Sequence, residues 1–377
     1  MERLLAVPRE QRRIVVYSED IASYNQLEGY LNAIVEKYEY PIVYVTSAPD
    51  DPLLADHHGS MSVFYVNRLV ASLFPRIDSE ICITTMPDLS KFHIRRPKKE
   101  CCCLYIFHSL NSIHEVYREG AFDHYDAFFC TGPHHKRELE THFKIHGLPM
   151  PSLYEVGYYK LDRVAEAYRF YTKQCPDKKT VLIAPSWGKG NLLETAGDEI
   201  VGRLLALGVR VIVRPHPCFF LPIYPNGAEI VENIARQFES HPEVVIERDI
   251  RSEDSFYEAD LMICDFSGAA FEYALGTLRP VLFVDVARKT MNPNWKKLDL
   301  PTFEDVVRRQ VGQVISPEEI RKLDEHATAM LSNQKQYADH LKNLRQELIY
   351  NFGESSRIGA QVVDDILGKG SICPAST

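Results

Sequence analysis

Apolar and polar positions divide most of this chain into short hydrophobic runs that alternate with longer segments of helical periodicity. In the C-terminal half, the hydrophobic runs predict strands at Thr180–Pro185, Val209–Arg214, Val244–Glu247, Asp260–Cys264 and Pro280–Asp285. Helical periodicity covers Asn191–Leu207, Ala228–Ser240, Glu253–Glu258 and Ala269–Leu275. Strands that alternate with helices across short loops predict a parallel sheet covered on both faces.

The N-terminal half shows the same alternation less regularly. Strands are predicted at Arg13–Tyr17, Ile42–Thr46, Ile81–Thr84, Cys103–Phe107, Ala127–Cys130 and Leu153–Val156. Helices are predicted at Asn25–Lys37, Met61–Phe74 and His134–His142, and again near the C-terminus at Pro317–Leu331, Gln336–Tyr350 and Arg357–Leu367. Lys160–Lys179 is predicted to connect the halves. The pattern predicts an α/β fold of GT-B type: two Rossmann-like parallel-sheet domains with a cleft between them and a helical C-terminal tail. We place the domains at residues 1–172 and 173–315 and the tail at 316–377.

Polar motifs follow three of the strands predicted in the C-terminal half. They are Ala184–Trp187, Arg214–Pro217 and Cys264–Glu272. In parallel sheets, ligands bind at the carboxyl ends of the strands. We therefore expect these motifs to form one site.

The last motif suggests the kind of ligand. Asp265 ends a strand, and Ser267 and Gly268 precede a predicted helix. Free backbone N–H groups at a helix start, at the positive end of the helix dipole, bind phosphate or diphosphate. Taken alone, Asp-x-Ser-Gly is also an ordinary helix cap and turn. The neighbouring motifs make a diphosphate site the preferred interpretation.

Composition limits the class of protein. The 377 residues carry a formal net charge of −9, whereas nucleic-acid binders normally show a basic excess. No apolar run approaches the roughly 20 residues that span a bilayer, and the first residues lack the apolar core of a signal peptide. The cysteines show no CxxC pair and are expected to be buried and reduced. We expect a cytoplasmic protein that binds no nucleic acid.

In this order and spacing, the motifs resemble those of the CDP-glycerol glycerophosphotransferase family, the teichoic-acid primases and polymerases with their capsule-polymer relatives. The family's Ala-Pro-Thr-Trp is matched by Ala184–Trp187, its Arg-x-His by Arg214–His216, and its Asp-Tyr-Ser-Ser with a following acidic residue by Asp265–Gly268 and Glu272. Its N-terminal His-Gly-Thr motif corresponds to His108–Ser112. The resemblance covers about residues 108–285.

The departures from the family pattern concern the substrates more than the reaction. Gly268 replaces the second serine, Glu272 stands where the family usually has aspartate, and His108 is followed by Ser-Leu. These differences put the identity of the polyol and of the acceptor in doubt.

The resemblance implies a transferase of cell-envelope biosynthesis. Such an enzyme moves glycerol phosphate from CDP-glycerol to a hydroxyl of a lipid-linked or polymeric glycan acceptor and releases CMP. The C-terminal domain would bind the CDP-polyol, and the N-terminal domain would face the acceptor. No cofactor and no metal are expected, because arginine, histidine and the helix dipole can stabilise the diphosphate.

Roles follow for individual residues. His108 is the predicted general base, because an imidazole titrates near neutral pH, and His216 is the second predicted catalytic residue. Arg214 can form a bidentate contact with phosphate oxygens through two N–H groups of its guanidinium group. The predicted binding residues are Pro185, Ser186, Arg214, Pro215, His216, Asp265, Ser267, Gly268 and Glu272.

Other functions remain open. The donor could be CDP-ribitol. The chain could instead be a GT-B glycosyltransferase or epimerase that uses a UDP-sugar, or a non-catalytic nucleotide-binding subunit. Its oligomeric state is also open.

One basic segment runs against the acidic average. Residues 91–99, from Lys91 to Lys99, carry Lys, His and Arg side chains interleaved with Phe92 and Ile94. A hydrated loop is the simpler interpretation. The alternative is transient contact with an anionic membrane surface, worth about 1 kcal/mol per basic residue, which would place the protein on the inner face of the cell membrane.

Overall fold

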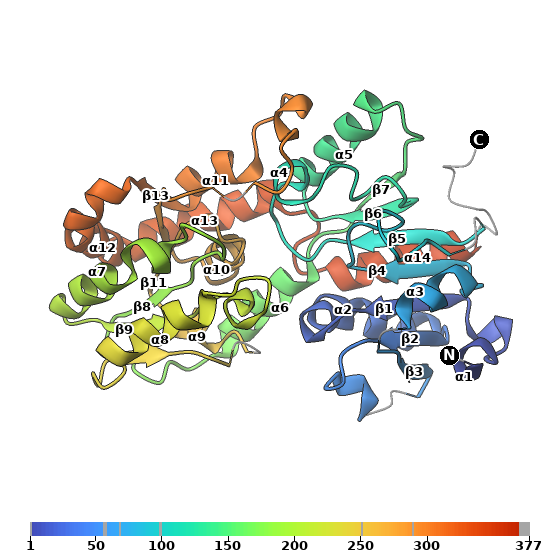
Figure 1. The fold of residues 1–377 in the computed structure, drawn as a ribbon, viewed down its shortest axis with the longest axis horizontal. Coiled ribbons are helices and arrows are strands. Elements are labelled where there is room, and N and C mark those ends of the chain that lie inside the picture. The colour runs from blue at the N-terminus through green and yellow to red at the C-terminus, as the bar shows by residue number, and fades with distance from the viewer. Residues whose placement is uncertain are drawn as a thin grey trace.

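The protein folds into two α/β domains, each built on a parallel sheet. The computed structural model describes residues 2–368 apart from 56–58, 68, 98–99, 250–251 and 289. Figure 1 shows the N-terminal domain (blue to cyan) beside the C-terminal domain (green to orange). The predicted fold class, a GT-B-like pair of Rossmann-like domains with a helical tail, is confirmed.

The N-terminal sheet has the strand order β3-β2-β1-β4-β5-β6-β7, and all its neighbouring strands are parallel. Its strands are β1 Ile14–Ser18, β2 Ile42–Thr46, β3 Met61–Tyr65, β4 Ile81–Thr84, β5 Cys102–Ile106, β6 Ala127–Cys130 and β7 Ser152–Glu155. The C-terminal sheet has the order β10-β9-β8-β11-β12-β13, again all parallel. Its strands are β8 Thr180–Ile183, β9 Arg210–Val213, β10 Val244–Ile246, β11 Leu261–Cys264, β12 Val281–Val284 and β13 Gly312–Ile315.

Helices cover both faces of each sheet. The α-helices are α1 Glu2–Leu5, α2 Ile21–Tyr38, α3 Val70–Leu73, α4 Ile113–Val116, α5 Pro133–Ile145, α6 Tyr159–Phe170, α7 Leu192–Ala206, α8 Gly227–Phe238, α9 Asp254–Glu258, α10 Ala269–Thr277, α11 Phe303–Val311, α12 Leu323–Ser332, α13 Gln334–Leu348 and α14 Ser355–Gly368. The 3-10 helices are η1 Arg9–Gln11, η2 Pro52–Leu54, η3 Phe74–Arg76, η4 Pro217–Phe220, η5 Trp295–Leu298 and η6 Pro317–Lys322.

The central strands are largely apolar because both their faces are buried. In β1, Ile14 and Val16 join one hydrophobic cluster while Val15 joins the cluster on the opposite face. In β8, Val181 and Leu182 divide in the same way between two clusters. Successive side chains of a strand point to opposite faces, so a sheet between two helical layers requires continuous apolar runs.

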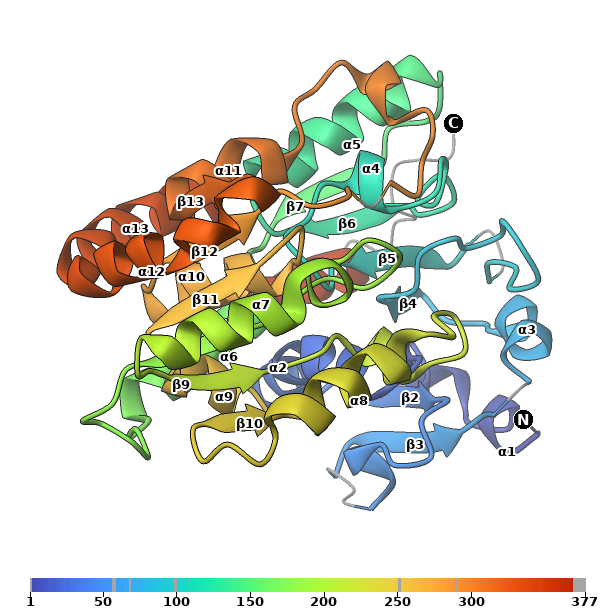
Figure 2. The same ribbon diagram turned by 60° about the vertical axis from the view of Figure 1, so that its left-hand side comes forward.

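Segments far apart in the sequence connect the domains. Helix α6 packs against α10 of the C-terminal domain and against α2 of the N-terminal domain. The last helix, α14 (red), returns to the N-terminal domain and packs on α2 (Figure 1). The segment between β12 and α11, which contains η5 (orange), leaves the C-terminal domain and lies beside α4 and α5 (Figures 1 and 2).

The prediction of a single helix over residues 61–74 was wrong. Met61–Phe74 was predicted as one helix, but Met61–Tyr65 form the edge strand β3, paired in parallel with β2. The β-branched and aromatic side chains of this run suit a half-buried edge strand. Lys160–Lys179, predicted to connect the halves, lies between β7 and β8 and begins within the helix α6, which packs against helices of both domains.

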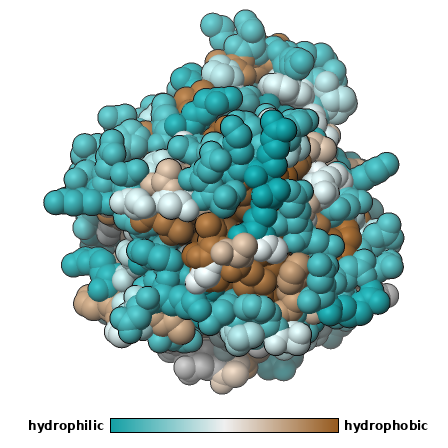
Figure 3. Space-filling view, turned by 90° about the vertical axis from the view of Figure 1, so that its left-hand side faces the viewer, coloured by the Kyte–Doolittle hydropathy of each residue, from teal (hydrophilic) through white to brown (hydrophobic). Residues whose placement is uncertain are grey.

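The outer end of the C-terminal domain, opposite to the N-terminal domain, is mostly hydrophilic around a central apolar area (Figure 3). Among the residues that the structure describes, no helix is both long enough and apolar enough to cross a membrane.

Candidate functional site

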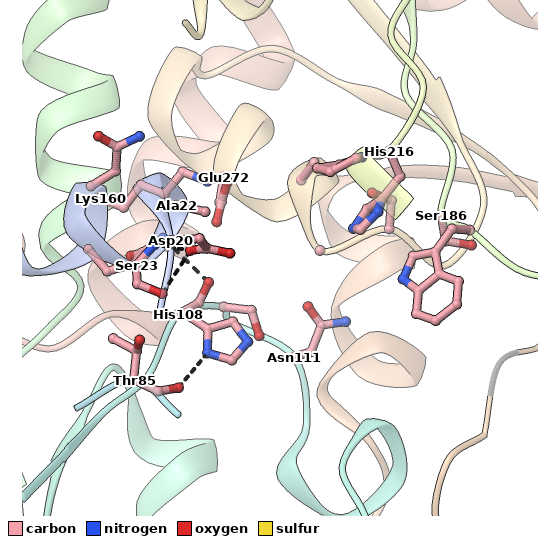
Figure 4. Close-up of a pocket in the computed structure, with 18 of the residues that line it drawn as sticks. Asp20, Ala22, Ser23, Thr85, His108, Asn111, Lys160, Ser186, His216 and Glu272 are labelled. Carbon is pink, nitrogen blue, oxygen red and sulfur yellow. Dashed lines mark hydrogen bonds and ion pairs between the residues drawn. The ribbon is translucent and has the colours of Figure 1, made fainter. Parts of the chain in front are cut away.

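The fold creates one crevice in each sheet, and the two crevices open into a shared cavity. Strand β1 lies between β2 and β4, and β8 lies between β9 and β11. At such switch points the connections leave to opposite sides and open a crevice at the carboxyl ends of the strands. Residues of both domains line a cavity of about 870 Å³ at this position. Figure 4 shows His108 and Asn111 on one side and His216 and Ser186 on the other.

The structure brings together all but one of the residues predicted from the sequence. The cavity is lined by His108, Pro185, Ser186, Arg214, Pro215, His216, Ser267, Gly268 and Glu272. They come from strand ends in both domains, which the predicted parallel topology requires. Their convergence is a fact of the fold, while the roles assigned to them stay predictions.

Asp265 is the exception, because it lies beneath the cavity wall and is fully buried. One carboxylate oxygen accepts a hydrogen bond from the backbone N–H of Ser186 (2.7 Å), and the other accepts from that of Leu192 (3.1 Å). Burial raises the pKa of this carboxyl group above its usual value. Asp265 therefore shapes the loop between β8 and α7 that forms part of the wall.

The first turn of α10, where the sequence suggested an anion site, lies at the cavity. Ser267, Gly268 and Ala269 line the cavity at the start of this helix. The first N–H groups of a helix have no partner within the helix, and the helix dipole adds positive potential there. This turn is therefore a suitable place for a diphosphate.

Arg214 and His216 lie at the end of β9, and both are engaged with their surroundings. Arg214 Nη1 donates to Glu247 Oε2 (2.9 Å), Ser252 O (2.9 Å) and Ser255 Oγ (3.0 Å). His216 Nδ1 accepts from the backbone N–H of Cys218 (3.1 Å). These contacts fix the Arg-Pro-His segment at the cavity wall.

His108 is held as a neutral imidazole. Its Nδ1 lies 3.2 Å from the carbonyl oxygen of Thr85 (Figure 4), and a carbonyl can only accept, so Nδ1 carries the proton. Nε2 then accepts from the hydroxyl of Tyr117 (3.2 Å). Burial is the main cause that lowers the pKa of His108. Nε2 is therefore the basic nitrogen. A substrate can reach it only by taking the place of the Tyr117 hydroxyl.

Glu272 is bound by residues from the junction of the domains. Its Oε1 accepts from Tyr158 Oη (2.7 Å), and its Oε2 lies 2.8 Å from Lys160 Nζ. Tyr158 Oη also lies 3.0 Å from the carbonyl oxygen of His108. The carboxylate of this predicted binding residue thus joins α10 to α6.

Sequence reasoning missed the acidic residues at the end of β1. Asp20 caps α2 by accepting from Ser23 N (2.8 Å) and Ser23 Oγ (2.9 Å). Glu19 lines the cavity and has no hydrogen bond or ion pair with any residue that the structure describes. Desolvation, with the charges of Asp20 and Asp88, raises the pKa of Glu19 to about 7. The Ser-Glu-Asp sequence directly after a predicted strand was the signal that could have found them.

A second carboxyl group, Glu304, comes from the first turn of α11. It is buried, and it accepts from Asn111 Nδ2 (2.7 Å) and from the backbone N–H of Ser112 (3.3 Å). Burial raises the pKa of Glu304 to about 7. No sequence signal pointed to it, because neither α11 nor its approach to Asn111 was predicted.

Further contacts join the C-terminal domain to the N-terminal domain along the segment that follows β5. Arg288 of the C-terminal domain forms a bidentate pair with Glu115 (2.5 and 2.6 Å). The same guanidinium group also contacts Asp305 (2.9 Å), and Asn292 Nδ2 donates to His114 O (2.9 Å). These ion pairs and hydrogen bonds, which lie at buried or half-buried residues, therefore fix the relative position of the two cavity walls.

The predicted absence of a metal stays a prediction. Among the described residues, no three His, Cys, Asp or Glu side chains are grouped so that they could hold a metal ion.

The basic segment is partly neutralised. Lys91 pairs with Asp123 (3.2 Å) and Arg96 with Asp126 (2.7 Å). Lys98 and Lys99 lie outside the described residues. The paired cations offer less charge to an anionic surface than the sequence suggested.

No protein-family model and no curated protein matches this sequence. Solved structures match along nearly the whole chain. A Listeria monocytogenes protein described as a UDP-N-acetylglucosamine 2-epimerase matches with 11% identity and a TM-score of 0.64, over 95% of this chain and 97% of that one. Staphylococcus aureus MnaA, solved with UDP, matches with 13% identity and a TM-score of 0.62, over 94% and 96%. The UDP-GlcNAc 2-epimerase of Methanocaldococcus jannaschii, in complex with UDP-GlcNAc and UDP, matches with 10% identity and a TM-score of 0.55, over 94% and 99%. At these identities the likeness shows the GT-B fold.

These findings correct the resemblance drawn from the sequence. Assignment to the CDP-glycerol glycerophosphotransferases is wrong, and with it the CDP-glycerol donor, the related CDP-polyols and the glycan acceptor. The matching structures include UDP-GlcNAc 2-epimerases solved with UDP-GlcNAc, and MnaA solved with UDP. The physical reason is that the shared motifs lie at the strand ends beside the switch point, where a GT-B domain places its ligand-facing residues whatever the nucleotide.

Proposed function

We propose that this protein binds a UDP-sugar in the cleft and inverts the configuration at C2 of the sugar, as a UDP-sugar 2-epimerase. One observation carries the proposal: two carboxyl groups with pKa values of about 7, Glu19 and Glu304, line the same cavity from different domains. Inversion at carbon requires a group that removes a proton from one face and a group that returns a proton to the other. Carboxyl groups that titrate near neutral pH suit both roles.

The diphosphate would lie against the first turn of α10. The N–H groups there and the helix dipole favour an anion, and the cavity volume of about 870 Å³ suits a nucleotide sugar. The structural neighbours solved with UDP or UDP-GlcNAc have the same fold over almost their full length, which supports this choice of nucleotide.

The chemistry follows from the bonds involved. The C2–H bond is not acidic unless the electron pair has a place to go. Departure of UDP from C1 accepts that pair: the C2–H and C1–O bonds break, a C1–C2 double bond forms, and the proton passes to a carboxylate. UDP then adds back to C1 as the other carboxyl group gives a proton to C2 from the opposite face. The α10 turn stabilises the departing diphosphate.

Exchange with heavy water tests this reaction directly. UDP-GlcNAc incubated with the enzyme in D₂O should exchange its C2 hydrogen for deuterium and form the C2 epimer, both visible by proton NMR. Glu304→Gln should lose exchange, while Glu199→Gln, an exposed site on α7, should retain it. If the wild type binds UDP but exchanges no C2 hydrogen, the epimerase proposal is wrong.

Glycosyl transfer is the second candidate. Ser23, Asn25 and Gln26 of α2 line the cavity and offer hydrogen-bond groups to a second sugar. In that case UDP release from UDP-GlcNAc would require an added acceptor, and the product would contain the transferred sugar.

A further inference from the structure

The phosphate-binding turn at Gly268 touches the other domain. A Cβ atom placed on Gly268 would lie 2.2 Å from Asn111 Oδ1, well inside the closest approach of real atoms. Gly268 has φ −62° and ψ −28°, a conformation that every residue type adopts. The backbone of the turn therefore does not require glycine. Glycine is required instead because the carboxamide of Asn111 leaves no room for a Cβ atom at this position.

Asn111 cannot move away easily. Its Nδ2 donates to Glu304 Oε1 (2.7 Å), and its backbone carbonyl oxygen lies 3.0 Å from His135 Nε2. The next residue, Ser112, donates its backbone N–H to Glu304 Oε2 (3.3 Å). Asn111 and Glu304 are both buried. The carboxamide oxygen is thus held at a fixed place against the first turn of α10.

We propose that Asn111, clamped by Glu304, is a positioning residue through which the N-terminal domain sets the diphosphate-binding turn at Gly268. This inference rests on the proposed binding of UDP at that turn. Affinity for the diphosphate then depends on the contact between the domains, although Asn111 itself need not touch the ligand. Any change that moves Asn111 toward the turn weakens binding, and removal of its side chain leaves room for a larger residue at 268.

A double-mutant cycle on UDP binding, measured by calorimetry, tests the proposal. Gly268→Ala should weaken UDP binding on the order of tenfold, since overpacking of one methyl group in a rigid site has a cost of that size. In the Asn111→Ala background the same substitution should change affinity by less than about threefold, because the obstructing oxygen is gone. Gly202→Ala is the matched control, since a Cβ there meets nothing within 4 Å.

A second variant keeps the test decisive if Gly268→Ala does not fold. Asn111→Asp keeps the shape but places a carboxylate between Glu304 and the phosphate turn. It should weaken UDP binding more at pH 8 than at pH 6, whereas a purely structural role predicts no such pH dependence. Equal UDP affinity of Asn111→Asp and wild type at both pH values would overturn the proposal. So would a double-mutant cycle in which the effects of Gly268→Ala and Asn111→Ala on UDP affinity simply add.

Failure of the proposed function is distinguishable from failure of this inference. If the wild type does not bind UDP, the proposed function fails, and the same cycle is measured with inorganic diphosphate. Coupling between positions 111 and 268 in that measurement supports the inference alone. Absence of diphosphate binding, or binding without coupling, overturns it.

Discussion

Lys160 Nζ lies 2.8 Å from Glu272 Oε2, and this ion pair joins α6 to α10 at the cavity, which both residues line (Figure 4). The Glu272 side chain is only 5% exposed and that of Lys160 21%. Removing one partner of such a pair leaves a charge that is largely cut off from water. The pair therefore stabilises the junction between the domains.

Lys160→Met should lower the free energy of unfolding by about 2–3 kcal/mol. Lys136→Met is the control, because Lys136 and Glu155 form a pair of similar length (2.7 Å) that is much more exposed. An exposed pair is worth about 1 kcal/mol or less. The measurement is the urea dependence of unfolding for both variants. Equal effects would mean that the Lys160–Glu272 pair contributes no more than a surface pair.

Asp265→Asn should destabilise the protein by about 1–3 kcal/mol, because an amide can accept only one of the two backbone hydrogen bonds from Ser186 and Leu192. The loop between β8 and α7 should loosen, so the amide hydrogens of Ser186 and Leu192 should exchange faster with solvent. Hydrogen exchange read by mass spectrometry checks this. Unchanged exchange in that loop would show that other contacts hold it.

The stability of the protein should decline as pH rises through the titration range of Glu304. Its pKa is about 7 in the folded protein against an ordinary value of 4.5. Between these values the folded state holds the proton and the unfolded state does not. The free energy of unfolding therefore falls by up to about 3 kcal/mol from pH 4.5 to 7 and is level above. Glu304→Gln cannot titrate and should lack the part of the decline that Glu304 causes, while Glu19, whose pKa is also raised to about 7, keeps its own part. The test is the difference in the free energy of unfolding between wild type and Glu304→Gln, measured across pH 5 to 8.

If His108 is a general base, His108→Gln should lower kcat by roughly 10²–10⁴-fold and leave UDP affinity within about twofold. Because burial lowers the pKa of His108, it stays unprotonated below its ordinary value of 6.5. In the pH dependence of kcat, the loss of activity caused by protonation of His108 should therefore begin below pH 6.5. A variant that keeps full kcat would assign His108 a structural role, in which its hydrogen bonds to Thr85 and Tyr117 only shape the wall.

Much of the fold could be read from the sequence because buried parallel strands are continuous apolar runs. The predicted Ile42–Thr46, Ile81–Thr84 and Ala127–Cys130 match β2, β4 and β6 residue for residue. The strand β13 was not found because it begins with Gly312 and contains a polar glutamine. Its glycine is explained only by the fold, since a Cβ there would lie 1.7 Å from Val281 O.

The site was predictable where it depends on one strand end and its own loop. Ser186, His216 and Gly268 belong to that class, and parallel topology brings them together. Glu304 and Asn111 became visible only in three dimensions, because their contact joins residues from different domains. The nucleotide could not be read from the motifs, because a helix start binds the diphosphate of any nucleotide equally well.

The return of α14 to the N-terminal domain affects how the chain folds as it is made. This helix packs so closely on α2 that a Cβ on Gly359 would lie 2.5 Å from the ring of Tyr30. The N-terminal sheet is complete at Glu155, but its covering helix starts only at Ser355, about 200 residues later. At roughly 5–20 residues per second, a growing chain would expose that face of α2 for about 10–40 s. The first domain to be synthesised is thus the last to be finished.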